Sequence, residues 1–417
     1  MNSDWKAFTV GELTINHDAK RIPVKEADRK SGEYPYYGAS GIVDWVDQFI
    51  FDGEFLLVAE DGENLRSRKT PVAFMAKGKF WVNNHAHIIQ GNEKADTRFL
   101  SYLLEGRDIS GYLTGSTIPK LSQGSLNAIE LEVPEVGEQK AIANILGTLD
   151  DKIELNRKTN ETLEAMAKAL FKSWFVDFDP VRAKAEGRTT GLPAEISDLF
   201  PDSFEDSELG EIPSGWITGR LEEILEVDPP RQLRRGSISP YLEMKGVPTS
   251  GHNAVDVIRR EFTSGSKFRN GDTLLARITP CLENGKTAFV DFLKDGEMGW
   301  GSTEFIVMCG RREELNPFAY YLARSEVFRN HSIQNMVGSS GRQRVPSDAV
   351  SAFTLPLPPE EILLKFGLLA TDLMRKISES AAQSSILSTI RDTLLPKLIS
   401  GEIRIPDAEK MLEEVGV

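Results

Sequence analysis

The sequence has few cysteines, no long apolar run and no excess of positive charge. Its two cysteines, Cys281 and Cys309, are too few for a disulfide framework or for a cysteine-based zinc site. No apolar stretch reaches the length of a membrane span, and the segment MNSDWKAFTV lacks the basic region and apolar core of an export signal. We therefore expect a cytoplasmic protein that does not contact a membrane.

Complete catalytic motifs are also missing. No glycine-rich cofactor loop follows a predicted strand, and there is no helicase phosphate loop. Adenine methyltransferases hold a flipped base with an acidic or amide residue, two prolines and an aromatic residue. The segments that begin at Asp228 and Asn316 each lack part of this set, so we expect a turn at Asp228-Pro229-Pro230 and a helix start at Asn316-Pro317.

Two further patterns superficially suggest a metal site and a nuclease. His85 and His87 could place two imidazoles near a metal, but no third ligand is evident, so one face of a sheet is the better interpretation. Pro406-Asp407 stands near acidic and basic residues, as in a nuclease core, but in a polar C-terminal tail without a strand. We therefore assign no catalytic and no metal-binding residue.

The second half of the chain repeats the first. Over residues 126–174 a constant shift of 224 positions pairs apolar residues without a gap. The matched pairs include Leu126 with Val350, Ile129 with Phe353, Leu131 with Leu355, Val133 with Leu357, Ile142 with Phe366, Leu149 with Leu373, Ile153 with Ile377, Leu163 with Leu387 and Leu170 with Leu394. Such a repeat suits double-stranded DNA, which has matching two-fold axes, but a duplicated enzyme or a pseudo-dimeric scaffold fits it equally well.

The charged residues are unevenly distributed, so the net charge alone does not exclude a nucleic-acid partner. The value of −14 argues at first against a nucleic-acid partner, since phosphate binding depends on lysine and arginine. Residues 177–228, however, hold fourteen acidic and four basic residues, whereas residues 229–280 hold nine basic and four acidic ones. A smaller basic group occupies residues 20–30 of the first copy. One charged run is usually a solvated face, but here basic groups recur in corresponding thirds of both copies.

Each copy predicts a mixed α/β globule followed by one long helix. β-rich runs are bounded by Gly, Asn and Asp, and each globule closes with a strand followed by proline. The predicted strands lie at 54–58, 86–90, 129–133, 273–277, 304–308 and 353–357, and a short helix at 97–104 recurs at 317–323.

The long helices are predicted at about 138–175 and 361–399. Both carry apolar residues at heptad spacing, as a coiled coil does. Both become polar at the same place, with Asn156 and Asn160 in one helix and Ser380 and Ser384 in the other. An antiparallel pairing would bring these polar stretches together, and we favour it over packing of each helix on its own globule.

Several segments carry a family resemblance. They are EQKAIANILGTLDDKIELNRKTNETLEAMAKALFKSWFVDFDPVRAKAEG, LFPDSFEDSELGEIPSGW, LNAIELEVPE, VSAFTLPLPPE and LLPKLISGEIRI. In these the chain resembles the DNA specificity subunits of type I restriction-modification systems over nearly its full length. The resemblance is specific in the helical parts and loose in the globules.

The resemblance implies an α+β protein with two tandem-repeat target-recognition domains, separated by two long helices that form an antiparallel coiled coil. Each domain would read one half of a split target on double-stranded DNA. Methylation subunits, two of them expected, and restriction subunits would dock on this chain. They would use S-adenosylmethionine, ATP and Mg, while this chain binds no cofactor. The second helix begins EEILLKF where the first has EQKAIAN, so the docking surfaces need not be equivalent.

The expected domain boundaries follow from the repeat and the helices. They are a first target-recognition domain at 1–134, a first spacer helix at 135–178, an acidic linker with a few helical turns at 179–208, a second target-recognition domain at 209–358, a second spacer helix at 359–400 and a C-terminal tail at 401–417.

Two loops in each copy are candidate DNA contacts: a Gly/Ser turn with basic residues before the closing strand, and the loop after the shared Leu-Leu strand. Small residues let backbone N–H groups approach phosphates, and arginine suits phosphates and base edges. With neighbouring basic residues, the candidates are Lys25, Asp61, Asn64, Arg66, Arg68, Ser116, Thr117 and Lys120, and Arg231, Arg234, Arg235, Arg277, Thr279, Asn284, Ser339, Arg342, Gln343 and Arg344. An ordinary surface turn is the alternative for each loop.

The sequence thus favours a non-catalytic DNA-recognition subunit that directs adenine methylation and restriction by its partners. A catalytic or bifunctional restriction-modification polypeptide is one alternative. A scaffold that never touches DNA is another, supported only by the acidic connector.

Overall fold

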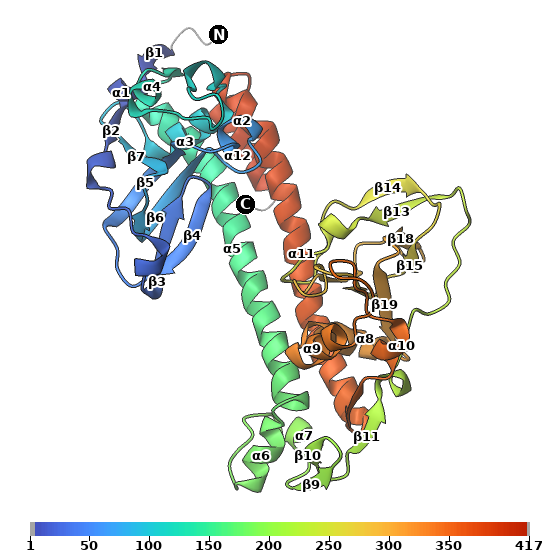
Figure 1. Ribbon diagram of the computed structural model, residues 1–417. Helices are drawn as coiled ribbons and strands as arrows, with labels where there is room; N and C mark the ends of the chain where they lie inside the picture. Colours follow the sequence, from blue (N-terminus) through green and yellow to red (C-terminus); the bar gives the residue numbers. More distant parts are fainter. Residues whose placement is uncertain (1–4, 415–417) are drawn as a thin grey trace. The chain divides into compact units, whose positions relative to one another are not determined.

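The computed structural model describes residues 5–414 and combines helices with β-sheets (Figure 1). The chain divides into two compact units: unit 1 consists of Met1–Glu154 and Ser385–Val417, and unit 2 of Leu155–Ser384. Unit 1 is therefore built from both ends of the chain. Within the described residues, no helix combines the length and apolar character needed to cross a bilayer.

A six-stranded sheet in the order β2-β7-β5-β6-β3-β4 forms the centre of unit 1, while β1 and β8 pair separately. Along β5, side chains alternate between two apolar clusters: Leu56 and Val58 pack with α3, and Leu57 packs with Phe80 on the other face. The strands are β1 (Lys6–Thr9), β2 (Thr14–Asn16), β3 (Ser31–Gly38), β4 (Gly41–Val46), β5 (Phe51–Ala59), β6 (Ala73–Val82), β7 (Ala86–Gly91) and β8 (Glu130–Val133).

The short helices of unit 1 are α1 (Val10–Leu13), α2 (Asn64–Ser67), α3 (Thr97–Gly106), α4 (Gln123–Asn127) and α12 (Ile405–Glu414). The start of α3 is capped by Asp96, whose carboxylate accepts a hydrogen bond from the backbone N–H of Phe99 at 2.9 Å. The expected polar C-terminal tail is instead the helix α12. It buries Ala408 and Leu412 in the core of unit 1, because these residues stand four positions apart on one helix face.

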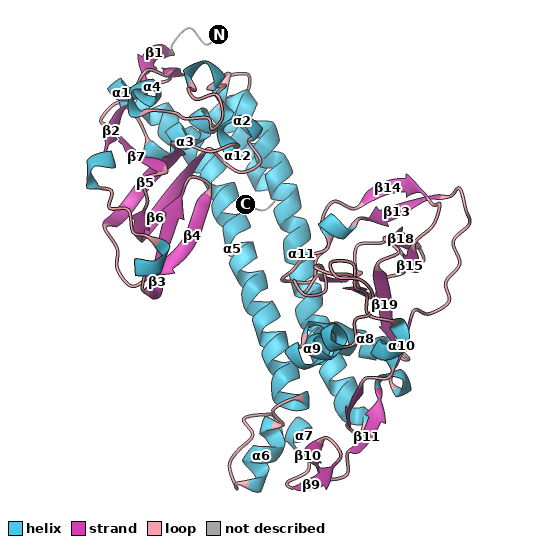
Figure 2. Cartoon of the chain, in the orientation of Figure 1, coloured by secondary structure: helices cyan, strands magenta, loops and turns pink. Residues whose placement is uncertain are grey.

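Two four-stranded sheets form unit 2, in the orders β12-β19-β16-β17 and β14-β13-β18-β15, and β11 pairs with β20 as β1 pairs with β8. The order β2-β7-β5-β6 in unit 1 thus matches β12-β19-β16-β17. Most strands of unit 2 are short and joined by long loops (Figure 2). They are β9 (Phe204–Ser207), β10 (Gly210–Pro213), β11 (Ile217–Arg220), β12 (Leu225–Val227), β13 (Ile238–Leu242), β14 (Ile258–Glu261), β15 (Ser266–Phe268), β16 (Thr273–Ala276), β17 (Thr287–Phe289), β18 (Gly299–Gly301), β19 (Phe305–Gly310) and β20 (Thr354–Leu357).

The short helices of unit 2 are α6 (Asp179–Ala185), α7 (Ala194–Ser197), α8 (Asn316–Arg324), α9 (Glu326–Gln334) and α10 (Ser347–Ser351). The predicted helix start at Asn316-Pro317 is confirmed, since α8 begins there. The acidic linker contains the expected short helices α6 and α7, but it is more than a connector. Val181 and Phe200 are buried with Trp216 in the main core of unit 2.

The two long helices are α5 (Val136–Phe175) and α11 (Glu360–Ile399), which confirms the predicted ranges (Figure 1). Each helix contributes to both units. The first half of α5 buries Leu146 and Leu149 in unit 1, and its second half buries Phe171 and Trp174 in unit 2. The first half of α11 conversely buries Phe366 in unit 2.

Within unit 2 the helices run in opposite directions. The amide of Asn156, near the start of the unit's part of α5, donates hydrogen bonds to Gln383 Oε1 at 2.9 Å and Ser384 Oγ at 3.1 Å, near the end of its part of α11. At the other end, the ring centres of Phe171 and Phe366 are 5.8 Å apart. The expected meeting of the polar stretches is thus confirmed. Within unit 1, Arg391 of α11 donates to Asp150 of α5 at 2.8 Å.

A buried polar cluster ties both helices to the sheets of unit 2. His252, with no exposed surface, lies 3.2 Å from Asp291, 3.5 Å from Glu164 of α5 and 3.1 Å from Ser378 of α11. Tyr320 of α8 donates to Glu164 at 2.9 Å. Burial lowers the pKa of His252, but its bonds to the two carboxylates outweigh burial and raise the pKa above its ordinary value.

Candidate nucleic-acid interface

In unit 1 the two candidate contact loops lie against each other. We call residues 60–68 of unit 1 and 277–284 of unit 2 the strand-end loops, and residues 114–120 and 337–344 the glycine turns. In unit 1 the N–H of Gly62 donates to the carbonyl of Pro119 at 3.1 Å, and that of Leu121 donates to the carbonyl of Glu60 at 2.8 Å. Arg66 adds a side-chain bond to the carbonyl of Gly115 at 2.9 Å. The loops therefore form one surface.

Unit 2 repeats this arrangement. The N–H of Thr279 donates to the carbonyl of Gln343, and that of Val345 donates to the carbonyl of Arg277, both at 3.0 Å. Lys120 in unit 1 and Arg344 in unit 2 are 224 positions apart, and each forms β-bridges both within its glycine turn and to its strand-end loop. The structure thus brings the same two loops together in both units.

Glycine is required in both turns. Gly115 has φ of +85°, and a Cβ atom there would lie 2.2 Å from the carbonyl oxygen of Ile118. Gly338 has φ of +121°, which side chains rarely adopt. A side chain would therefore clash with the backbone at position 115 and would strain the backbone at position 338.

The basic residue that closes each turn is held by a carboxylate. Lys120 Nζ lies 3.2 Å from Glu60 Oε1, and Arg344 makes a bidentate pair with Glu304 at 2.7–3.0 Å. Much of the charge of these two basic residues is therefore compensated within the protein. The sequence did not predict either pairing, and Glu304 stands forty positions from Arg344 in the chain.

Other predicted residues are engaged in local structure. Arg68 donates to the backbone carbonyls of Glu105 and Arg107 at 2.6 and 2.5 Å, and Asn64 makes two hydrogen bonds with the backbone of Thr70. Arg231 is largely buried: its side chain is 8% exposed and pairs with the buried Asp272, so most of its charge is compensated within unit 2.

Further candidates bond mainly to their own loops. Asp61 lies 2.9 Å from His85, Arg277 donates to the carbonyl of Val345 at 3.1 Å, and Thr279 donates weakly to the carbonyl of Gln343. A second set is exposed, and in the described part of the chain its side chains have no hydrogen bond or ion pair. This set is Lys25, Ser116, Thr117, Arg234, Arg235, Asn284, Ser339 and Arg342. Gln343 is half-buried.

A cavity of about 590 Å³ in unit 2 adds one basic residue that the candidate set lacked. Lys267 lines it together with Arg231 and Arg277. Gly265, with φ of +151°, leaves room there, since a Cβ atom would lie 2.0 Å from the carbonyl oxygen of Gly301. Lys267 belongs to the basic stretch 229–280, but its proximity to Arg277 follows only from the folded sheet.

The buried His87 packs beneath the strand-end loop and the glycine turn of unit 1 and bonds to the residue that follows the turn. Its Nδ1 lies 2.6 Å from Asp18, its Nε2 lies 2.8 Å from the carbonyl oxygen of Leu121, and Glu60 stands 3.8 Å away. Both ring nitrogens are thus occupied by protein atoms, whereas His85 faces Asp61. Within the described residues, no group of three His, Cys, Asp or Glu side chains could hold a metal ion.

We expect His87 to make the stability of the chain depend on pH. Burial lowers the pKa of His87, but the bonds to Asp18 and Leu121 and the carboxylate charges outweigh it, so the pKa is raised. The stabilisation is fully present below the unfolded pKa of about 6.5 and is lost as pH rises through the folded value. In urea unfolding, the stability difference between the native chain and His87→Gln should shrink with rising pH; a difference that does not change with pH would contradict this.

The amino-acid sequence is similar to those of specificity subunits of type I restriction enzymes. A family model described as the type I restriction modification DNA specificity domain matches residues 2–165. The chain is 24% identical to the type I restriction enzyme MjaIX specificity subunit of Methanocaldococcus jannaschii, over 97% of this chain and 98% of that protein. It is 22% identical to the HindI specificity subunit of Haemophilus influenzae, over 96% of this chain and 100% of the relative.

A solved structure shares the fold. The crystal structure of the S subunit of a type I restriction-modification system from M. genitalium superposes with a TM-score of 0.61, at 17% identity, over 95% of this chain and 97% of that one.

Proposed function

We propose that the chain is a DNA specificity subunit of the type I restriction-modification family and that each of its units reads one half of a two-part DNA target. Its relatives are named specificity subunits of restriction enzymes, and the chain fills the same non-catalytic role in such a complex. Sequence recognition is its task, and methylation and cleavage are the tasks of its partners.

One observation carries the proposal: the strand-end loop and the glycine turn meet in both units. Each pair of loops offers backbone N–H groups and small side chains for phosphates, with polar and basic side chains at its edge. Two copies of one surface suit two half-sites on a duplex.

We further propose that the units act as tandem target-recognition domains. In this arrangement α5 and α11 form an antiparallel coiled coil that serves as a spacer. The heptad spacing of apolar residues and the contact of Asn156 with Gln383 and Ser384 support this. Polar residues inside such a seam commonly fix the register of the two helices.

The proposed partners are two methylation subunits, restriction subunits and double-stranded DNA. S-adenosylmethionine, ATP and Mg would be bound by those subunits and not by this chain. The unequal starts of α5 and α11, which read VGEQKAI at 136–142 and EEILLKF at 360–366, support docking surfaces that differ between the two halves.

Substitution of Arg342 tests the proposed interface. Arg342 is exposed and unpaired at the tip of the glycine turn, so Arg342→Ala should weaken target binding by the assembled complex without unfolding the chain. Loss of a bidentate base contact would cost about 1–3 kcal/mol and relax one target position, whereas loss of a phosphate contact would weaken all sequences alike and flatten the salt dependence. The readout is affinity by titration at several salt concentrations.

Arg188→Ala provides the control, because Arg188 is an exposed arginine of the linker that pairs only with the nearby Glu186. It should leave target affinity unchanged. Equal affinities for the native, Arg342→Ala and Arg344→Ala complexes would show that this turn faces away from DNA.

A further inference from the structure

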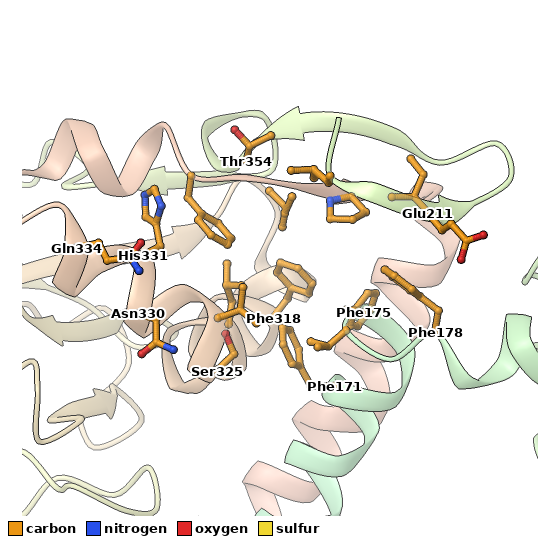
Figure 3. A pocket seen from close by; sticks show the side chains of 18 residues that line it. Phe171, Phe175, Phe178, Glu211, Phe318, Ser325, Asn330, His331, Gln334 and Thr354 are labelled. Atoms are coloured by element: carbon orange, nitrogen blue, oxygen red, sulfur yellow. The ribbon is translucent and has the colours of Figure 1, made fainter. Parts of the chain in front are cut away.

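An open cavity of about 640 Å³ in unit 2 has an apolar floor that DNA reading does not require (Figure 3). Phe171 and Phe175 of α5 and Phe318 of α8 meet on one side of it, with ring centres 5.1–5.4 Å apart. Phe353 and Leu355 complete the apolar lining. None of these residues belongs to a strand-end loop or a glycine turn.

The lining of this cavity also includes the polar residues Asn330, His331 and Gln334, and an exposed acidic hairpin borders one edge. The hairpin formed by β9 and β10 carries Glu205, Asp206, Glu208 and Glu211, all exposed, and Glu211 borders the cavity. Across the described part of the chain, no ion pair joins any of the four to a basic side chain. Two apolar rim residues are also open to solvent: Leu209 is 44% exposed and Val327 is 54% exposed.

The acidic hairpin and the apolar floor favour a protein segment over DNA as the ligand of this cavity. Four uncompensated carboxylates repel phosphates, which argues against DNA at this surface. An apolar floor with an acidic hairpin at one edge complements a segment with apolar residues on one face and lysine or arginine on another.

We propose that this cavity docks a basic, amphipathic segment of a protein subunit of the complex. Its apolar side chains enter between Phe171, Phe318 and Phe353, and its basic side chains face the β9–β10 hairpin. The inference rests on the proposed function only in taking the chain to act in a complex with other subunits.

The corresponding place in unit 1 is less suited to such a segment. There a smaller cavity of about 270 Å³ is lined by Glu130 and Glu132, at the positions that Thr354 and Pro356 occupy in unit 2. Two carboxylates in the lining would have to be desolvated by an apolar guest, which is costly. The structure therefore assigns one docking segment of this kind to each chain.

Photo-cross-linking identifies the occupant. Benzoylphenylalanine replaces Val327 in this chain, and the chain is purified in complex with its methylation and restriction subunits. The complex is then irradiated, and cross-linked peptides are identified by mass spectrometry. We expect one adduct with a subunit segment rich in lysine or arginine and in apolar residues, and no adduct with that segment when the probe replaces Glu132. An adduct with DNA or with a second copy of this chain, or no adduct, would overturn the proposal.

Affinity measurements check the chemistry. Leu209→Asp combined with Val327→Asp should weaken binding of the cross-linked subunit about tenfold or more, equivalent to about 1.4 kcal/mol. Val255→Asp, at a site 56% exposed in the same unit, should have no effect. Replacing the four hairpin acids by their amides should reduce the salt dependence of binding. The proposal would be contradicted if neither the double aspartate variant nor the amide variant changed the affinity or its salt dependence.

The outcomes separate this proposal from the proposed function. If the complex methylates its two-part target but gives no adduct at position 327, only the docking proposal fails. If the unsubstituted complex recognises no two-part target, the proposed function fails, whatever the cross-link shows.

Discussion

Replacing Phe366 by alanine is expected to destabilise unit 2 by about 3–5 kcal/mol. Phe366 of α11 has no exposed surface, and its ring lies 5.2 Å from Phe175 of α5 and 6.4 Å from Phe318 of α8, centre to centre. Both long helices and α8 thus meet at this side chain. Its loss would leave a cavity that three separate elements would have to close together.

Denaturant unfolding of the full chain measures this effect. Domains are commonly stable by only about 5–15 kcal/mol, so the variant should unfold at a much lower denaturant concentration. The matched control is Leu368→Ala, on the same helix but 60% exposed, which should change stability by less than about 0.5 kcal/mol. A loss below about 1 kcal/mol for Phe366→Ala would show that the helices do not depend on this contact.

Lengthening both long helices by four residues is expected to widen the unread gap in the DNA target and to keep both specific blocks. Four residues add about 6 Å of helix, close to the rise of two base pairs. The insertions must be paired, one beside Asn156 in α5 and one beside Ser384 in α11, because these residues contact each other. An insertion in α5 alone would break that register.

Adenine methylation mapped across a genome measures the gap. With the proposed spacer, the paired variant should methylate the same two blocks at a larger separation. Four residues inserted near Gly191, in the exposed part of the linker, serve as the control and should leave the gap unchanged. An altered block with the original gap would exclude helices that set the spacing.

The sequence was most informative where periodicity is long. Heptad spacing over about forty residues predicted α5 and α11 within two residues at each end, and the shared polar stretch predicted which residues meet, as Asn156 and Ser384 do. The internal repeat likewise predicted equivalent glycine turns before the two closing strands, and in the structure Lys120 and Arg344 hold corresponding places in these turns. Such features rest on local periodicity and can be read without knowing the tertiary structure.

Contacts between distant parts of the chain could not be read in this way. Arg344 has the same appearance in the sequence as Arg342, yet only Arg344 is held by Glu304. Arg231 belongs to a basic stretch, but its partner Asp272 comes from another strand region of the folded unit. The burial of α12 in unit 1 depends on the return of the C-terminal segment to the N-terminal globule.

Mapping methylated adenines in cells that hold the methylation subunits, with and without this chain, tests the proposed function most directly. We expect methylation at one target made of two short blocks with a fixed gap, lost when the chain is absent and restored when it is supplied. Methylation that persists unchanged without the chain, or a continuous target with no gap, would contradict the proposed function.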